Sequence, residues 1–293
     1  MTRVIVLGAT GMLGRGVLEA LRGTNFHVVG SSRNGQSLLE HPEVQSIGFD
    51  ASVDKLSILD HTVSEGDYII NCIGIIKPYI RDEDAQERRI AMQINGIFPD
   101  DLARYAEKAN IRVLQIATDC VYSGFTGLYS EESEFDAMDV YGKTKSLGEV
   151  PSPTMMHLRV SIIGPETGRS SSLFEWVRNQ PHEAEIFGFT DHLWNGVTTF
   201  HFGQLCRGII EGDLFTSGTY HLIPGSIVSK FELVTALAAR AGRSDISIIP
   251  KASGKTVDRT LSTKYQSLNQ KIWLSSGYEE PLDVLEMVAK MPI

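Results

Sequence analysis

A glycine-rich turn that directly follows a short apolar run limits the folds open to this chain more than any other feature. The run at 3–7 reads Arg-Val-Ile-Val-Leu, as expected for a buried parallel strand, and 14–22 has the pattern of a helix. Between them stand Gly8, Gly11 and Gly14. Such glycines permit a tight turn, a close backbone approach to an anion and close packing of helix on strand. The segment therefore predicts the opening of a parallel sheet, with an anion site at the helix N-terminus.

The spacing of these glycines, G-x-x-G-x-x-G, differs by one residue from the G-x-G-x-x-G fingerprint of dinucleotide-binding turns. Glycine-rich turns also occur as simple connections between elements, and the turn by itself leaves that alternative open. On the dinucleotide interpretation, six residues of the turn contact a cofactor. They are Gly8, Thr10, Gly11, Met12, Leu13 and Gly14.

Strand-like and helix-like segments alternate through the first part of the chain. Strands are expected at 4–7, 27–31, 46–49, 68–72, 112–118 and 157–163, and helices at 12–22, 35–41, 52–64, 83–109 and 141–149. Such alternation is typical of an α/β protein with a Rossmann-type doubly wound parallel sheet. Ligands of that architecture bind beyond the carboxyl ends of the strands, where we expect the functional residues to collect.

After residue 164 the alternation loosens, and Gly, Pro and Ser punctuate 164–172. We expect a dinucleotide-binding Rossmann domain at 1–163, joined by parts of 196–215, and a smaller C-terminal α/β substrate lobe at 164–293. Helices at 172–179, 201–211, 229–241 and 282–290 and strands at 184–187, 219–222 and 246–249 would form this lobe. Some of these elements are also candidates to return to the first sheet.

Tyr141 and Lys145 stand four residues apart, so on a helix they share one face. A positive charge beside a phenol favours the phenolate and lowers its pKa from about 10, towards values useful for acid or base catalysis. A half-buried tyrosine beside a solvated lysine is the plain alternative. The position of the pair downstream of the glycine turn favours a catalytic role.

The end of the second strand indicates which dinucleotide is bound. NAD-binding proteins usually place an acid there for the ribose 2′-hydroxyl, whereas an arginine accommodates the 2′-phosphate of NADP. Here the strand ends in Ser31-Ser32-Arg33 without an acid. Ser32 and Arg33 therefore predict a preference for NADP(H), because a guanidinium forms charge-assisted hydrogen bonds with phosphate. A surface arginine with no ligand, and NAD(H) as the cofactor, are the alternatives.

Composition argues against several other kinds of protein. A formal net charge of -9 offers no basic footprint for nucleic acid or an anionic membrane. The longest apolar stretch, at 68–76, is interrupted by Asn71 and is too short to span a bilayer. Cys72, Cys120 and Cys206 form no C-x-x-C pair and predict neither a disulfide framework nor a metal site. With a strand almost directly after Met1, we expect no signal peptide and a cytoplasmic location.

Taken together, these features resemble the extended short-chain dehydrogenase/reductase superfamily. The glycine turn, the run Thr-Asp-Cys-Val-Tyr-Ser-Gly at 118–124 and Tyr-x-x-x-Lys at 141–145 carry the likeness. Weaker matches at 158–161, 196–199, 218–222 and 258–264 favour the dTDP-4-dehydrorhamnose reductases and related nucleotide-sugar reductases, although proline is absent after Arg259. The resemblance covers nearly the whole chain.

The resemblance implies a catalytic triad of Thr118, Tyr141 and Lys145. In a reductase, a hydride passes from the nicotinamide to a carbonyl carbon while Tyr141 delivers a proton to the oxygen. Lys145 would also hydrogen-bond the nicotinamide ribose, and Thr118 would hold the carbonyl oxygen. The further cofactor contacts that the resemblance implies are Asp50, Asn71, Cys72, Ile73, Gly74 and Asn95. For Asp50 a helix cap, and for Asn71 a strand-end residue bonded to backbone, are the plain alternatives.

The substrate implied is a nucleotide-diphosphate sugar, which needs cations around its phosphates. Arg259 is the best candidate because it lies in the part of the tail that resembles the family. Lys77, Asp119, Arg169 and Trp194 are further candidates, although a tryptophan is also a common core or interface residue.

Cys120 lies two residues after Thr118 and points the same way along an extended segment. Bifunctional epimerase/reductases of the superfamily carry a cysteine at the matching position, where it exchanges a proton beside the keto group. A thiol that titrates not far above neutrality suits that chemistry. The His or Lys that acts as its partner in those enzymes has no clear match at 168–176.

Three functions therefore compete. The first is an NADPH-dependent reductase of a nucleotide-linked 4-keto-6-deoxy sugar, in deoxysugar or polysaccharide biosynthesis. The second is a nucleotide-sugar epimerase or epimerase/reductase that uses Cys120, and the third is a non-catalytic dinucleotide-binding subunit that regulates a partner. A homodimer is expected by analogy, because the helix at 83–109 and the Tyr141 helix form a dimer face in many relatives.

Overall fold

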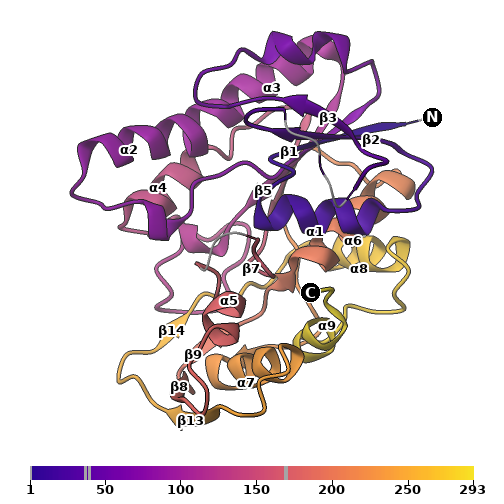
Figure 1. Ribbon diagram of the computed structural model, residues 1–293. Coiled ribbons are helices and arrows are strands. Elements are labelled where there is room, and N and C mark those ends of the chain that lie inside the picture. The colour runs from indigo at the N-terminus through magenta and orange to yellow at the C-terminus, as the bar shows by residue number, and fades with distance from the viewer. Residues whose placement is uncertain (1, 36–37, 39–40, 168–170) are drawn as a thin grey trace.

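The computed structural model describes residues 2–35, 38, 41–167 and 171–293, and a seven-stranded parallel sheet lies at its centre (Figure 1). The strand order is β11-β6-β5-β4-β1-β2-β3, and every neighbouring pair is parallel. The strands are β1 (Arg3–Leu7), β2 (His27–Ser32), β3 (Gln45–Gly48), β4 (Tyr68–Asn71), β5 (Arg112–Ala117), β6 (Met155–Arg159) and β11 (Gly218–His221). The predicted α/β class and Rossmann-type doubly wound sheet are confirmed.

Helices cover both faces of this sheet, because its strands are apolar on both sides. In β1, Val4 and Val6 join the core beneath α1 (Met12–Leu21), α6 (Thr199–Glu211) and α8 (Gln266–Ser275). Ile5 and Leu7 face the opposite way, towards α3 (Phe98–Ala109). The period of two along each strand therefore builds two separate cores, one on each face of the sheet.

The predicted helix at 83–109 is continuous but not uniform. It consists of α2 (Ala85–Ala91), one π-helical segment η3 (Met92–Ile97) and α3. The Asp84 carboxylate caps its start by accepting the N–H groups of Gln86 and Glu87, and Asn110 ends it with a φ of 53°. The π segment carries Asn95, and such segments often mark functional positions.

Three expected elements differ in the structure. Residues 52–64 contain only the short 3₁₀ helix η1 (Leu56–His61), because the Asp54 carboxylate accepts the Asp50 N–H and folds 50–54 into a turn. The strand expected at 157–163 is interrupted after β6, and β7 (Ile162–Ile163) pairs with β10 (Val197–Thr198). In the helix expected at 35–41, residues 36, 37, 39 and 40 lie outside the described residues, and the others are not helical.

The lower part of Figure 1 holds a smaller group of elements from the C-terminal half. Two parallel strands, β8 (Glu185–Phe189) and β13 (Ser247–Lys251), pack against α7 (Lys230–Arg240), with α5 (Leu173–Arg178) and α9 (Val284–Lys290) alongside. A small three-stranded sheet joins β12 (Val228–Ser229), β9 (His192–Trp194) and β14 (Val257–Asp258). Meanwhile β11 extends the central sheet and α6 packs on α1, so the C-terminal half contributes to both groups. The boundary at 163/164 stays a prediction.

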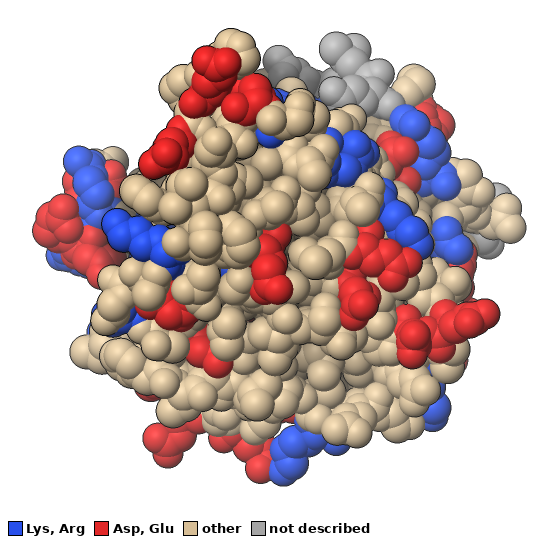
Figure 2. Space-filling model, turned by 90° about the horizontal axis from the view of Figure 1, so that it is seen from below, with Lys and Arg blue, Asp and Glu red and all other residues tan. Residues whose placement is uncertain are grey.

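Charged side chains are scattered on the face of the molecule seen from below. Figure 2 shows Lys and Arg interspersed with Asp and Glu around a wide uncharged area. Within the described ranges, no helix is long and apolar enough to cross a membrane.

Candidate active site

The glycine turn forms a tight cradle at the carboxyl end of β1. Gly8 has a φ of +76°, and the Gly11 N–H donates to the Gly8 carbonyl at 3.0 Å. A Cβ on Gly14 would lie 2.2 Å from the Gly8 oxygen, so no larger residue fits there. Helix α1 begins after Gly11 with neither a side-chain cap nor an acidic residue in its first turn. Its N-terminal N–H groups are therefore suited to a phosphate, which is the fit that a dinucleotide requires.

The loop that follows β4 is held by two asparagines. The Asn71 Oδ1 accepts the Ile73 N–H at 3.1 Å, and the Asn95 amide exchanges two 2.9 Å hydrogen bonds with the backbone of Ile75. Asn71 is thus a strand-end residue bonded to the backbone, which is the alternative to a cofactor contact given for it above. Gly74 lies against Asn95, where an added Cβ would be 3.5 Å from its Oδ1. The predicted cofactor contacts of this loop, including that of the half-buried Cys72, stay predictions.

The end of β2 lies beside the glycine turn. The Ser31 hydroxyl accepts the Gly8 N–H at 2.9 Å, Ser32 is buried and Arg33 is exposed. The Asp50 carboxylate accepts the Ser52 hydroxyl and N–H, which lowers the pKa of Asp50, and Arg33 lies close enough to lower it further. No helix starts at Asp50, so this carboxylate closes a turn rather than capping a helix.

Thr118 and Tyr141 come together at the carboxyl end of β5. Thr118 directly follows this strand and caps the 3₁₀ turn η4 (Asp119–Val121), while Tyr141 lies in the first turn of α4 (Val140–Leu147). The two elements approach closely, because a Cβ on Gly142 would lie 2.4 Å from the Cys120 carbonyl. The Thr118 side chain lies close enough to the Tyr141 phenol to lower its pKa. The two hydroxyl groups therefore lie on the same side of this strand end.

Lys145 is anchored to the same strand. Its side chain is buried, and Nζ donates to the Ile116 carbonyl at 3.0 Å, two residues before Thr118. Burial lowers the pKa of Lys145 to about 8, although the Glu149 carboxylate acts to raise it. The spacing of four residues thus places Tyr141 and Lys145 on the α4 face that looks onto the end of β5.

The predicted lowering of the Tyr141 pKa is wrong in this structure. Burial raises the pKa of Tyr141 well above 10 and the neighbouring Cys120 raises it further, although Thr118 acts to lower it. The reason is that desolvation disfavours the phenolate. Tyr141 is consequently a neutral proton donor rather than a base in the protein alone.

Cys120 is half-buried near Tyr141. Burial, and next the Asp119 carboxylate, raise its pKa to about 12, so the expectation of a thiol that titrates near neutrality is also wrong. Burial likewise raises the pKa of Asp119, although Arg259 and Lys230 act to lower it. Both acidic groups thus lie within the electrostatic reach of two cations from the C-terminal half.

Those two cations, Arg259 and Lys230, face the catalytic end of the sheet. Arg259 donates from Nε to the Tyr122 carbonyl at 2.9 Å, and Lys230 starts α7 with Nζ 5.7 Å from the centre of the Trp194 ring. Burial lowers the pKa of Lys230 while Asp119 acts to raise it. The sequence analysis missed Lys230, because a single lysine at a helix start carries no motif.

The remaining predicted substrate residues are placed less directly. Lys77 pairs with Asp139 at 2.6 Å, beside the start of α4. Trp194 is buried and donates from its indole to the Ser161 hydroxyl at 2.8 Å, as expected for an interface aromatic. Arg169 lies outside the described residues.

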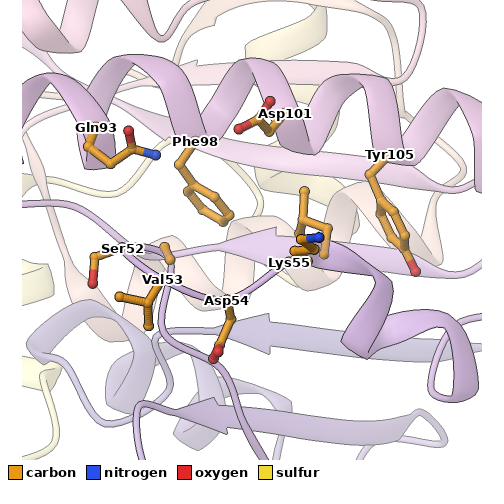
Figure 3. Close-up of a pocket in the computed structure, with 10 residues that line it drawn as sticks. Ser52, Val53, Asp54, Lys55, Gln93, Phe98, Asp101 and Tyr105 are labelled. Atoms are coloured by element: carbon orange, nitrogen blue, oxygen red, sulfur yellow. The ribbon is translucent and has the colours of Figure 1, made fainter.

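Two hollows lie in the described part of the structure. An aromatic hollow of about 240 Å³ includes Lys230 in its wall, and is lined by Leu173, Trp176, Phe187, Gly188, Phe189, His192, Lys230 and Val234. A second hollow of about 360 Å³ lies between residues 51–56 and the side chains of Phe98, Asp101 and Tyr105 on α3 (Figure 3). Its lining begins one residue after Asp50 and includes none of the predicted triad. The described residues contain no cluster of three or more His, Cys, Asp or Glu that could hold a metal ion.

Comparisons with known proteins agree with this geometry. The family model described as the RmlD substrate binding domain matches residues 1–291. A dTDP-4-keto-6-deoxy-D-glucose reductase of Streptomyces niveus is 30% identical over 281 residues, which is 94% of this chain and 91% of that protein. Methionine adenosyltransferase 2 subunit beta of Xenopus tropicalis is 25% identical over 254 residues, covering 80% and 71% of the two chains.

The fold has close counterparts among solved structures. A dTDP-4-dehydrorhamnose reductase of Bacillus anthracis, solved in complex with NADP, superposes with a TM-score of 0.74 over 99% of both chains. The sequence identity is 18%, so this likeness concerns the fold alone.

Proposed function

Because the chain belongs to the RmlD substrate binding domain family, we propose that it is an NAD(P)-dependent oxidoreductase that reduces the keto group of a nucleotide-linked sugar. The observation that carries the proposal is that Thr118, the neutral Tyr141 phenol and the anchored Lys145 gather at the end of β5, in a chain whose glycine turn is shaped for a dinucleotide. The relative from Streptomyces niveus, named as a reductase of such a sugar, supports it.

The residues divide the chemistry between them. When bound, the nicotinamide supplies the hydride for the keto carbon. Tyr141 holds the proton that the keto oxygen needs, and its raised pKa keeps that proton in place until negative charge develops on the oxygen. Thr118 orients the same oxygen through its hydroxyl. Lys145 is positively charged near neutrality, and such a cation stabilises the phenolate that remains once Tyr141 has given up its proton.

We propose NADPH as the preferred reductant, because Arg33 is exposed at the end of β2 and no acid replaces it there. The proximity of Arg33 to Asp50 places the guanidinium at the rim of the same site. The dissociation constants of NADPH and NADH, measured for the wild type and for Arg33→Ala, test this preference. We expect NADPH to bind more tightly and the variant to lose that difference. An NADH constant equal to or lower than that of NADPH contradicts it.

We propose a dTDP- or UDP-linked 4-keto-6-deoxy sugar as the substrate. The aromatic hollow suits a nucleobase and Lys230 lines it. Lys230 and Arg259 both lie within electrostatic reach of Asp119, next to Thr118, where a diphosphate would link base to sugar. Each part of a nucleotide sugar then has a chemically matched part of the protein. A biosynthetic role in deoxysugar or polysaccharide formation follows from that substrate class.

Product analysis with a deuterated cofactor tests the reductase proposal. The protein is incubated with each keto sugar and with NADPH labelled on the transferred position. We expect a nucleotide sugar in which the former keto carbon carries a hydroxyl group and deuterium. Protein that binds the cofactor but forms no labelled alcohol from any keto sugar contradicts the proposal.

A non-catalytic subunit is the second candidate function, favoured by the likeness to methionine adenosyltransferase 2 subunit beta. The same dinucleotide turn would then serve binding alone, and the Tyr141 pair would have no chemical task. Retained NADPH binding with no turnover of any keto sugar would support this candidate.

Epimerisation by Cys120 is disfavoured, because a thiol with a pKa of about 12 is a poor base near neutrality. Deuterium uptake from the solvent beside the keto group, abolished by Cys120→Ser, would restore that proposal.

We also propose a homodimer formed through α2, η3 and α4. These elements pack together, and they leave Ile90, Ile97 and Leu147 between 40% and 64% exposed. Size-exclusion chromatography with light scattering, with Leu147→Glu as the disrupting variant, tests this assembly.

A cytoplasmic location agrees with the three free cysteines of the described chain, since thiols stay reduced there.

A further inference from the structure

A buried arginine, Arg159, binds residues that follow the predicted catalytic residues Thr118 and Lys145 in the chain. Arg159 ends β6, and its side chain is 2% exposed. It donates from Nε and Nη2 to the two carboxylate oxygens of Glu149, at 3.1 Å and 2.5 Å. Its remaining nitrogen, Nη1, lies 2.6 Å from the Tyr122 hydroxyl and 2.7 Å from Nε2 of His221. One guanidinium thus binds three separate segments of the chain, with the two-pronged geometry that suits a carboxylate.

Two of these partners lie close to predicted catalytic residues along the chain. Glu149 stands four residues after Lys145, just beyond the end of α4. Tyr122 stands four residues after Thr118, at the end of η4. The distance between the Thr118 hydroxyl and the Tyr141 phenol therefore depends on two elements that Arg159 ties together.

Tyr122 extends this connection to the substrate side. Its hydroxyl donates to the Ser130 carbonyl at 2.9 Å, and its own carbonyl accepts the Arg259 Nε at 2.9 Å. The ring also stacks on Tyr129, with centroids 4.2 Å apart.

His221 fixes the third segment. A guanidinium can only donate, so Nε2 of His221 accepts and Nδ1 carries the hydrogen that binds the Ser262 carbonyl at 2.6 Å. Burial, and next the Arg159 charge, lower the pKa of His221 to about 4 and keep the ring neutral. The tail that carries Arg259 is thereby attached to the same guanidinium.

The energetics argue that this arrangement serves geometry rather than stability. A buried ion pair costs so much desolvation that replacing both partners by neutral side chains is often harmless to folding. A misplacement of about 1 Å in a catalytic group can nevertheless cost about 10²-fold in rate. On the basis of the proposed function, we infer that Arg159 is a positioning residue, which holds the Thr118 segment and the Tyr141 helix at the separation that reduction requires.

The double variant Glu149→Gln, Arg159→Met tests the inference, because it removes both charges and leaves neither partner buried alone. We expect kcat for the keto sugar to fall about 10- to 100-fold, whereas KM and the Kd of NADPH stay close to those of the wild type. A folded double variant with wild-type kcat overturns the inference. A loss of NADPH binding together with kcat also overturns it, because that result marks a structural role.

Tyr122→Phe provides a second test that leaves the ion pair intact. It removes the hydroxyl that accepts from Arg159 and donates to the Ser130 carbonyl, and we expect a smaller fall in kcat with unchanged KM. An unchanged kcat contradicts the inference even if the double variant does not fold. The matched control is Arg243→Met, Asp245→Asn, an ion pair at 2.8 Å in the C-terminal half, which is expected to keep wild-type kcat. A wild type that reduces no keto sugar refutes the proposed function instead, so the two failures are distinct.

Discussion

The two walls of the candidate site are held in different ways. The Rossmann wall, made of Thr118, Tyr141 and Lys145, lies on its own strand end, where the buried Lys145 donates a hydrogen bond to the Ile116 carbonyl. The lobe wall, made of Lys230 and Arg259, comes from a helix start and the chain's tail, and both side chains are half-buried. Within the described part of the chain, neither cation forms an ion pair within 4 Å. The chemistry is therefore built in advance, while the charges for the substrate stay available.

Removing the Lys145 ammonium should have the largest effect on this contrast. We expect Lys145→Met to lower kcat about 10²- to 10⁴-fold, because the phenolate left on Tyr141 loses its stabilising cation. Steady-state kinetics with saturating cofactor measure the change. An unchanged kcat with a raised KM would contradict the assignment of catalysis to the Rossmann wall and of substrate binding to the lobe wall.

The lobe wall should respond in the opposite manner. Lys230→Met and Arg259→Met each remove a charge-assisted contact worth about 1.5 to 3 kcal/mol, so KM should rise about 10- to 100-fold with kcat nearly kept. Calorimetric binding of dTDP and of thymidine sharpens the test, since only the diphosphate should lose affinity. Equal losses for both ligands would place these cations elsewhere than beside the phosphates.

The segment that joins the two walls offers a third test. The Tyr129 hydroxyl accepts the N–H groups of Gly124 and Phe125 at 3.1 Å and 3.0 Å, and its backbone pairs with the tail at Thr260. Tyr129→Phe should reduce the free energy of unfolding by about 1 to 3 kcal/mol, because these donors lose their acceptor. Denaturant titration measures it, with Tyr265→Phe as an exposed control. Equal stability of the two variants would show that the hydrogen bonds to the Tyr129 hydroxyl do not stabilise this segment.

A fourth test is the pH dependence of stability. Burial lowers the pKa of Lys145 from 10.5 to about 8, so the unfolded chain binds the proton more tightly between these values. The burial penalty is complete below about pH 8 and disappears as the pH rises to 10.5, so stability from this group increases across that window. Relative to Lys145→Met, the wild type should gain at most about 1.4 kcal/mol per pH unit. If the free energy of unfolding changes with pH in the same way for the two proteins, the burial of a charged Lys145 is contradicted.

The sequence predicts the Rossmann wall better than the lobe wall, for a physical reason. The glycine turn and the Tyr141–Lys145 spacing are local patterns, and the period of two in β1 predicts its burial on both faces. Lys230, by contrast, gains its role from a neighbour more than a hundred residues away, Asp119. Helix α8 was missed because Asn269 shares its buried stripe with Ile272 and Trp273, which hides the apolar period.

Electrostatics were the least predictable part of the site. Proximity in sequence indicated that Lys145 would ionise Tyr141, but the sequence contains no measure of desolvation, which raises the phenol's pKa instead. The same omission led to the wrong expectation for Cys120. The Arg159 network was also invisible, because its members Tyr122, Glu149 and His221 are scattered along the chain.

The most direct test of the account is the oxidation of NADPH by the wild type and by Tyr141→Phe, with freshly prepared dTDP- and UDP-4-keto-6-deoxy sugars. We expect loss of the reduced-nicotinamide absorbance with at least one of these sugars, and a rate about 10²- to 10⁴-fold lower in the variant although NADPH still binds. Equal rates in both proteins, or no oxidation by wild-type protein that binds NADPH, would contradict it.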